Sequence, residues 1–213
     1  MHELNVVGVD ISSEAISLAR FNQRQLLQEY DEHVCGTSER TRKTAAKNIQ
    51  FLKADILEPS PGSRAETLRQ TLSQTPFWDI VISNPPYISP NAFDRTTSRS
   101  VRNFEPKLAL VPSRLAPVDD EAQGDWFYPR LLELSEAVDA NILLVEVSNM
   151  DQAVRVAAMA RERKRWQGIE IWRDEPQLQQ QDVFDEISII GHGHGRSVLC
   201  WTRYGGQLMG KPC

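Results

Sequence analysis

Cysteine is scarce in this chain, and long apolar runs are missing. Only three of the 213 residues are cysteine: Cys35, Cys200 and Cys213. An odd number of cysteines at wide spacing indicates neither a disulfide framework nor a zinc site, and it suits a reducing compartment. His192 and His194 could bind a metal ion, but no third ligand is obvious, so we expect no metal. No stretch reaches the ~18 apolar residues of a membrane span, and the start, Met-His-Glu-Leu-Asn, lacks the basic and apolar regions of a signal peptide.

A dense basic segment is also missing. The chain has 24 Lys and Arg against 29 Asp and Glu, a net charge of -5. Phosphate binding requires a basic surface, so we expect no direct nucleic-acid partner and no membrane partner. Arg161, Arg163, Lys164 and Arg165 form the one local basic cluster, which is typical of a solvated helix end.

What the sequence does contain is an alternation of short apolar runs with amphipathic stretches. β-Branched, uncharged runs predict strands. They lie at 4–9, 49–52, 79–83, 141–147, 169–172 and 197–202. Helices are expected at 12–29, 126–138 and 152–165, the first capped by Ser12 or Ser13. This order predicts an α/β fold with a largely parallel, Rossmann-like sheet, helices on both faces and an antiparallel C-terminal strand pair.

The remaining segments are polar or rich in turn-forming residues. We expect a surface insertion at 31–47, a Pro-, Gly- and Ser-containing region at 59–76 with a short helical stretch at 65–72, and loops at 88–124 and 178–195. A length of 213 residues suits one domain, which we place at 1–203, followed by a loose tail at 204–213.

Acidic residues follow the first two expected strands. In open parallel sheets, ligands bind at the carboxyl ends of strands. Asp10 can accept hydrogen bonds from both hydroxyls of a ribose, or it can be an acid that favours the start of the next helix. Asp55 has the same ambiguity, because it can bind an adenine amino group or form a turn. Glu146 ends a later strand.

The most specific motif is Asn84-Pro85-Pro86-Tyr87, directly after the strand at 79–83. Two prolines fix the backbone, remove two N–H donors and leave carbonyl groups free to accept. Asn84 adds an acceptor and a donor, and Tyr87 adds a flat face for stacking. Together they predict a slot for a planar group that carries an NH2, either an amide or the exocyclic amine of a base.

These motifs resemble a known family. Asp-Ile-Val-Ile-Ser-Asn-Pro-Pro-Tyr resembles the amino-methylating class of S-adenosyl-L-methionine-dependent methyltransferases. Two further segments narrow the match: Val-Gly-Val-Asp-Ile-Ser-Ser-Glu-Ala resembles the family's second strand with its ribose-binding acid, and Val101–Leu110 resembles V-x-x-(F/Y)-E-P-x-x-A-L. The closer resemblance is to the HemK-type protein-(glutamine-N5) methyltransferases, which modify peptide chain release factors. It covers residues 4–203, and Leu144–Val147 with Gln152–Val154 resemble its later strand and helix start.

The resemblance implies a set of site residues. Asn84, Pro85, Pro86 and Tyr87 would be catalytic, with the substrate amide donating to the Asn84 side chain and the Pro85 carbonyl. S-adenosyl-L-methionine would be the cofactor. Its binding residues would be Asp10, Ile11, Asp55, Ile56 and Asn84. Glu105 and Pro106 would join Asn84, Pro85 and Tyr87 in holding the substrate, the Gly-Gly-Gln loop of a release factor. We expect a monomer, mitochondrial by resemblance and otherwise cytoplasmic.

The chain also departs from the family pattern. A glycine-rich loop, acid-x-Gly-x-Gly-x-Gly, and its strand normally precede the strand that resembles 4–9. We expect this chain to be a carboxy-terminal portion that binds S-adenosyl-L-methionine poorly and has little activity. Two alternatives stay open: an N6-adenine or N2-guanine methyltransferase acting on nucleic acid, and a non-catalytic remnant of the fold. Gly205-Gly206-Gln207 repeats the family's target tripeptide, which we attribute to chance in a mobile tail.

Overall fold

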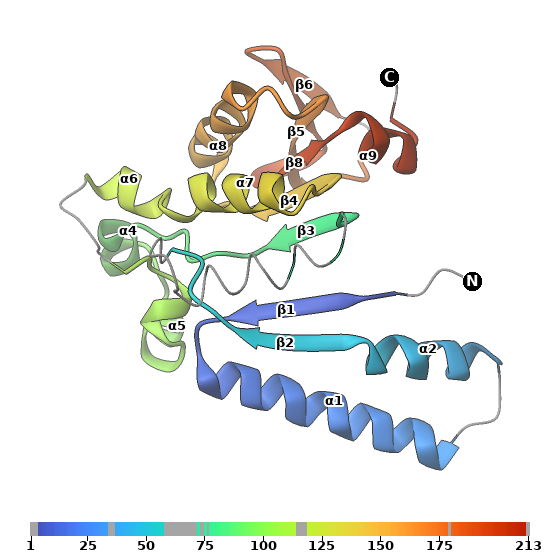
Figure 1. Cartoon of the computed structure of the whole chain (residues 1–213). Helices are drawn as coiled ribbons and strands as arrows, with labels where there is room; N and C mark the ends of the chain where they lie inside the picture. The colour runs from blue at the N-terminus through green and yellow to red at the C-terminus, as the bar shows by residue number, and fades with distance from the viewer. Residues whose placement is uncertain are drawn as a thin grey trace. The chain divides into compact units, whose positions relative to one another are not determined.

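A computed structural model describes residues 4–33, 37–57, 72, 75, 77–113, 119–178 and 180–211. The chain divides into two compact units, Met1–Gln70 and Thr71–Cys213, and each has its own sheet (Figure 1). Within the described ranges, none of the helices has the length and apolar character needed to cross a bilayer.

The first unit is a parallel strand pair with two helices. Strand β1 (Val6–Asp10) pairs with β2 (Ile49–Lys53) in the register Val6↔Ile49 to Asp10↔Lys53. Between them run α1 (Ser13–His33) and α2 (Thr37–Lys47). Ser12 caps α1, because its hydroxyl accepts a hydrogen bond from the Ala15 amide. The apolar runs that predicted these strands are confirmed, but the turn-prone insertion expected at 31–47 is wrong, since residues 37–47 form α2.

Gln23 ties this helix pair to the strands. Its side-chain amide donates 2.8 Å hydrogen bonds to the carbonyl oxygens of Ala46 and Ile49, which flank the end of α2 and the start of β2. The short helical stretch expected at 65–72 lies outside the described residues except for Leu72.

The second unit contains a six-stranded sheet in the order β3-β4-β8-β5-β7-β6. The strands are β3 (Ile80–Ser83), β4 (Ile142–Glu146), β5 (Gly168–Glu175), β6 (Gln181–Phe184), β7 (Ile187–Ile190) and β8 (His192–Trp201). Strand β3 pairs with β4 in parallel, and β8 lies between β4 and β5, antiparallel to both. The expected antiparallel C-terminal pair is therefore confirmed.

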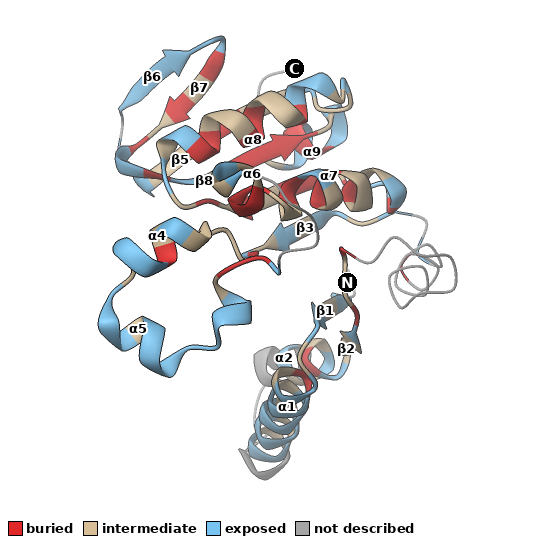
Figure 2. Ribbon diagram, turned by 90° about the vertical axis from the view of Figure 1, so that its left-hand side faces the viewer, coloured by how far each residue is buried: buried red, intermediate tan, exposed pale blue. Residues whose placement is uncertain are grey.

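Helices cover both faces of this sheet. Helix α7 (Phe127–Ala137) precedes β4, and α8 (Met150–Glu162) follows it. The small buried side chains of α8, Ala153, Ala157 and Ala160, allow it to pack closely on β5 and β8. On the other face, Met209 packs with Ile142, Leu199 and Trp201, just after helix α9 (Arg203–Leu208). Figure 2 shows buried residues on β8, α7 and α8, and β4 is also mostly buried. The α/β, Rossmann-like fold class is confirmed.

Three expectations for this unit are wrong. The loop expected at 88–124 contains α4 (Pro90–Arg95), α5 (Arg99–Phe104), the 3-10 helix η1 (Lys107–Ala109) and α6 (Asp120–Gly124). Serine and aspartate caps start most of these short helices: Ser89, Ser98 and Asp119 accept from amides three residues ahead. The loop expected at 178–195 contains the hairpin β6–β7 and the start of β8.

The tail expected after residue 203 forms α9 instead. Thr202 caps it, with its hydroxyl accepting from the Gly205 amide at 3.2 Å. Gly205 and Gly206 are buried, because their lack of side chains lets the helix approach Asn141 and Trp201. The Gly-Gly-Gln tripeptide therefore belongs to a packed helix and not to a mobile tail.

Candidate functional site

In the first unit, Asp10 and Asp55 lie at the same edge of the strand pair. Asp10 ends β1, and Asp55 follows β2 by two residues. The Ala54 amide donates to the Asp10 carbonyl at 3.1 Å, which continues the pairing to this edge. The prediction that carboxylates gather at the carboxyl ends of these strands is confirmed within this unit.

Each of these carboxylates also forms a local turn. Asp10 Oδ1 accepts from the Ser12 amide at 2.7 Å, and Asp55 Oδ1 accepts from the Leu57 amide at 2.9 Å. For each side chain, the second oxygen has no hydrogen-bond partner within the described ranges. The turn role and a ligand role are thus compatible, because one oxygen can serve each.

The chemistry of this edge fits a nucleoside. Ribose hydroxyls and an adenine amino group are donors, and the free carboxylate oxygens are acceptors. Ile11, which is 41% exposed, and the half-buried Ile56 add apolar surface beside them. Asp10, Ile11, Asp55 and Ile56 remain predicted cofactor residues.

In the second unit, the Asn84-Pro85-Pro86-Tyr87 loop leaves the sheet directly after β3. Pro85 is buried, which anchors the middle of the loop, while Asn84 is exposed. The Asn84 side chain makes no hydrogen bond with any other residue that the structure describes. Its amide can therefore serve a ligand, as the sequence predicted.

Tyr87 is fixed through its hydroxyl. The hydroxyl donates a 2.8 Å hydrogen bond to Glu146 Oε1 at the end of β4. Burial raises the pKa of Tyr87 to about 12, and the hydrogen bond and charge of Glu146 contribute to the increase. Glu146 is also held through its main chain, because the Tyr128 hydroxyl donates a 2.9 Å hydrogen bond to the Glu146 carbonyl oxygen. Tyr87 is thus a neutral, oriented aromatic ring at physiological pH.

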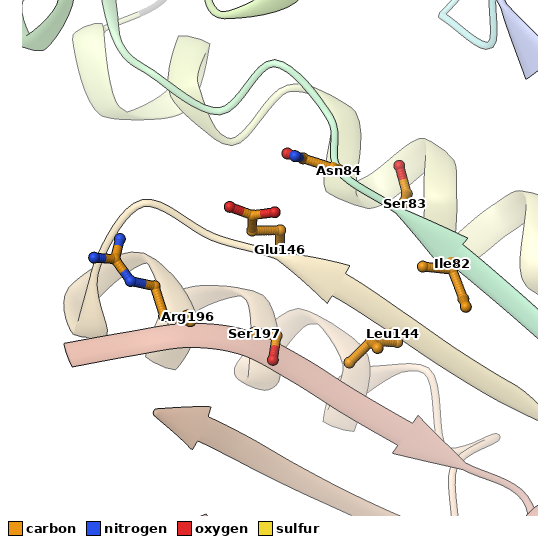
Figure 3. A pocket seen from close by; sticks show the side chains of 7 residues that line it. All are labelled: Ile82, Ser83, Asn84, Leu144, Glu146, Arg196 and Ser197. Atoms are coloured by element: carbon orange, nitrogen blue, oxygen red, sulfur yellow. The ribbon is translucent and has the colours of Figure 1, made fainter. Parts of the chain in front are cut away.

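A pocket lies at the ends of β3 and β4 and beside the first half of β8 (Figure 3). Its apolar wall is formed by Ile82 and Leu144, and its polar lining is Ser83, Asn84, Glu146, Arg196 and Ser197. Figure 3 shows Asn84, Glu146 and Arg196 at one end of the pocket and the two apolar residues at the other. Arg196 is also paired with Asp174 at 2.5 Å, and this hydrogen bond raises its pKa. The pocket can accept a small group that has both N–H donors and an apolar part.

Sequence reasoning assigned no role in the site to a buried network behind the loop. Gln152 is 3% exposed, and its side-chain amide donates to the Tyr87 carbonyl at 3.2 Å and to Asp125 Oδ1 at 2.8 Å. Asp125 is 5% exposed and accepts two hydrogen bonds from Arg155, at 2.6 and 3.1 Å. Gln152 and Arg155 lie on α8, but Asp125 follows α6 and Tyr87 follows β3, so no local sequence signal could have joined the network.

Asn84 belongs to the lining of this pocket as the described residues define it, but Pro85, Pro86 and Tyr87 do not. Glu105 and Pro106, the other predicted substrate residues, also lie outside this lining. Both are exposed, between α5 and η1. The preceding Phe104 is 86% exposed, an unusual state for a large apolar side chain. This part of the chain is therefore exposed surface in the structure, and Glu105 and Pro106 remain predicted substrate residues.

Metal binding finds no support in the described ranges. They contain no group of three or more His, Cys, Asp or Glu side chains arranged to hold an ion.

Comparisons with known proteins connect both units to one enzyme class. The sequence family described as Eco57I restriction-modification methylase matches residues 4–107. A release factor glutamine methyltransferase of Chlorobaculum tepidum is 37% identical over 106 residues, which are 50% of this chain and 27% of that protein. Over about half of its length, the chain is similar in sequence to this release factor glutamine methyltransferase. The resemblance inferred from the motifs is confirmed.

Two further relatives support the same assignment. A release factor glutamine methyltransferase of Bacillus subtilis is 30% identical over 131 residues, covering 61% of this chain and 31% of that protein. A fission yeast protein (Schizosaccharomyces pombe), named probable MRF1 mitochondrial N(5)-glutamine methyltransferase mtq1, is 28% identical over 163 residues, covering 72% and 43%. This chain spans between 27% and 43% of the length of these three relatives.

A solved structure was also found, the hMettl16 catalytic domain in complex with a MAT2A 3'UTR hairpin 1. It aligns with a TM-score of 0.46 at 10% identity, covering 93% of this chain and 55% of that one. This similarity is too low to bear on function.

Proposed function

We propose that this chain carries the substrate loop of an S-adenosyl-L-methionine-dependent methyltransferase that modifies the side-chain nitrogen of a glutamine in a peptide chain release factor. The observation that carries the proposal is the loop after β3: Asn84 is exposed and its side-chain amide has no hydrogen-bond partner among the described residues, while the Tyr87 hydroxyl is held by Glu146, which lines the same pocket as Asn84. The relatives' names supply the substrate class.

The loop suits a primary amide. An amide nitrogen is a weak nucleophile, because its lone pair is shared with the carbonyl group. The Asn84 side-chain oxygen and the Pro85 carbonyl oxygen accept hydrogen bonds from the two N–H groups of the substrate amide. These hydrogen bonds orient the amide nitrogen and stabilise the positive charge that develops on it during methyl transfer. Tyr87 and Pro86 pack on the amide plane. The neutral Tyr87 hydroxyl stays bound to Glu146 and orients the ring without titrating.

The methyl donor belongs to the other unit in this proposal. When bound, S-adenosyl-L-methionine supplies a methyl group on a positively charged sulfur. Asp10 and Asp55 would hold its ribose and adenine through the oxygens that their turns leave free. The family match at 4–107 extends across the division between the units, so we propose that both are parts of one methyltransferase domain at 1–203, with 204–213 following it.

The partner and location follow from the same relatives. We propose a release factor as the protein partner, with Glu105, Pro106 and the exposed Phe104 on the surface that meets it. We propose a mitochondrial site of action, because one relative is named as mitochondrial.

The decisive experiment is mass spectrometry of a release factor after incubation with the chain and S-adenosyl-L-methionine. We expect one added methyl group on the glutamine of the Gly-Gly-Gln peptide, at the low rate expected for a sequence without the acid-x-Gly-x-Gly-x-Gly loop, and we expect Asn84→Ala to reduce that rate by about 10²-fold. Asn91→Ala is the matched control, since Asn91 is exposed on α4 outside the pocket. An equal rate for the two variants would remove Asn84 from the mechanism.

A second candidate function is methylation of a base in nucleic acid. It is favoured by the name of the matching family, a restriction-modification methylase, and by the loop, which accepts an exocyclic amine as well as an amide. The net charge of -5 disfavours it. Methyl transfer to DNA or RNA but not to a release factor would decide for this candidate.

Calorimetric titration with S-adenosyl-L-methionine tests the third reading, a non-catalytic remnant, which predicts no binding.

A further inference from the structure

Tyr87 is bound at two points by residues of other elements. Its hydroxyl is held by Glu146, at the end of β4, and its carbonyl oxygen accepts from Gln152, in the first turn of α8. A residue held at both its ring and its backbone has little freedom to rotate. The position of the aromatic face in the substrate loop therefore depends on these two partners.

The orientation of Gln152 is itself determined. The Ser148 amide donates to Gln152 Oε1 at 2.7 Å, so the oxygen must face Ser148 and the NH2 group must face Tyr87. One N–H bonds to Asp125 Oδ1 at 2.8 Å, and the other is shared between the carbonyls of Tyr87 and Gly124, at 3.2 and 3.3 Å. If the Gln152 side-chain amide were rotated by 180°, its NH2 group would face the Ser148 N–H, and its oxygen would face the Asp125 carboxylate and the Tyr87 carbonyl oxygen.

The close approach of α6 also depends on this arrangement. A Cβ atom added to Gly124 would lie 3.3 Å from the Tyr87 carbonyl oxygen and 3.6 Å from the Gln152 side-chain nitrogen. Glycine at this position lets the backbone come near the loop. Behind it, Arg155 holds Asp125 by two hydrogen bonds, so the acceptor that orients Gln152 is fixed in turn.

We propose that Gln152 is a positioning residue for the methyl-transfer reaction: oriented by Asp125 and Arg155, it fixes the backbone of Tyr87 and so sets the aromatic face against which the substrate amide packs. The proposal rests on the proposed function. Gln152 does not touch the substrate and acts through Tyr87. Small displacements of a positioning group lower the rate of the chemical step more than they lower binding.

The test compares two buried glutamines by the same substitution. Gln152→Met keeps the length of the side chain and removes the N–H groups that reach Tyr87. Gln123→Met is the control, because Gln123 is 7% exposed and its amide donates to the Pro112 carbonyl at 3.0 Å, not to Tyr87. Gln123→Met removes one side-chain hydrogen bond and Gln152→Met removes four, so both changes lower stability and Gln152→Met lowers it more.

The first readout is fluorine NMR of the full chain labelled with 3-fluorotyrosine. The chain has four tyrosines, and Tyr87→Phe assigns the line of Tyr87. We expect Gln152→Met to shift and broaden the Tyr87 line and Gln123→Met to leave it unchanged. A Tyr87 line in Gln152→Met that matches the wild type would overturn the proposal.

The second readout is methyl transfer to a release factor. We expect Gln152→Met to lower kcat about tenfold or more while KM for the release factor stays within about twofold, and Gln123→Met to change neither. An equal loss in both variants would mean that Gln152 is only a structural residue. Absence of transfer by the wild type would refute the proposed function, whereas the Tyr87 line would still decide whether Gln152 fixes the loop.

A second variant covers the case in which Gln152→Met does not fold. Gln152→Glu combined with Asp125→Asn exchanges the amide and the carboxylate, so the two side chains can keep a hydrogen bond between them and the number of carboxylates in the network is unchanged. No N–H then points at the Tyr87 carbonyl. We expect the Tyr87 line to move as in Gln152→Met, and an unmoved line in the folded double variant would contradict the proposal.

Discussion

Replacing Arg155 by methionine tests whether burial decides the value of an ion pair in this protein. Arg155 pairs with Asp125 at 2.6 Å, and the Asp125 side chain is only 7% exposed. Arg161, on the same helix, pairs with Asp185 at the same distance of 2.6 Å, but the exposed fractions are 45% and 61%. The two ion pairs thus have the same closest N–O distance, and they differ mainly in how far the carboxylate is buried.

The expected magnitudes differ several-fold. Arg155→Met leaves a buried carboxylate with the Gln152 N–H as its remaining side-chain donor, and such a loss costs about 3 kcal/mol, near the lower end of the usual range. Arg161→Met breaks an exposed pair, which is worth less than about 1 kcal/mol. With a slope of about 2 kcal/mol per molar urea, the unfolding midpoint falls by about 1.5 M in the first case and less than about 0.5 M in the second.

Tryptophan fluorescence during urea unfolding is the appropriate assay. All five tryptophans lie in the second unit, so the signal reports the unit that contains both ion pairs. Adding Asp125→Asn to Arg155→Met removes the unpaired charge, and we expect it to recover about 1 kcal/mol or more. Equal midpoints for the two single variants, or no recovery in the double variant, would refute the reasoning.

Three further predictions concern the site and the packing around it. Glu146→Gln should lower the pKa of Tyr87 from about 12 part of the way to its ordinary value, since burial, the larger cause, remains. The difference in tyrosinate absorbance between the protein and its Tyr87→Phe variant measures this pKa. Because the pKa of Tyr87 is higher in the native than in the unfolded protein, the contribution of the protonated hydroxyl to stability is present at neutral pH and is lost as the pH rises toward 12. Gly205→Ala should destabilise the protein by about 2 kcal/mol, because the new Cβ would lie 2.3 Å from a carbonyl oxygen, whereas Gln207→Ala on the same helix is exposed and should cost less than about 0.5 kcal/mol by thermal unfolding. Cys200 is buried, which raises the pKa of its thiol, so with the other two cysteines replaced by serine it should not react with a thiol reagent until the protein unfolds; prompt labelling of the native protein would contradict its placement.

Most strands were predictable from sequence because each contains a short run of apolar, mostly β-branched residues, and in β4 this run is buried. Ile142–Glu146, for example, has three β-branched or leucine side chains that are at most 6% exposed. The helix Thr37–Lys47 was missed because its charged and hydroxyl residues give little apolar periodicity; a segment of this composition is also typical of a loop. The hairpin at 181–190 was missed because Asp185 and Glu186 form its turn with positive φ angles of 48° and 65°, which glycine or asparagine would normally signal.

The candidate site was predictable only in part, for a similar reason. Asn84-Pro85-Pro86-Tyr87 is contiguous and follows a strand, so its place at the sheet edge was predictable from order alone. The partners of Tyr87 are 59 and 65 residues away in sequence, and their contact depends on how β4 and α8 pack. A hydrogen bond between such distant residues leaves no pattern in a single sequence.

The position of β8 has a consequence for how this protein is made. Strands β4 and β5 do not touch as neighbours, because β8, the last of the described strands in sequence, is inserted between them. During synthesis, β4 and β5 are made before residues 192–201, so their inner edges cannot pair in this sheet until β8 has been made. Apolar edges of this kind attract other chains. The six-stranded sheet can therefore be completed only after the last of the described strands has been inserted between two that precede it in the chain.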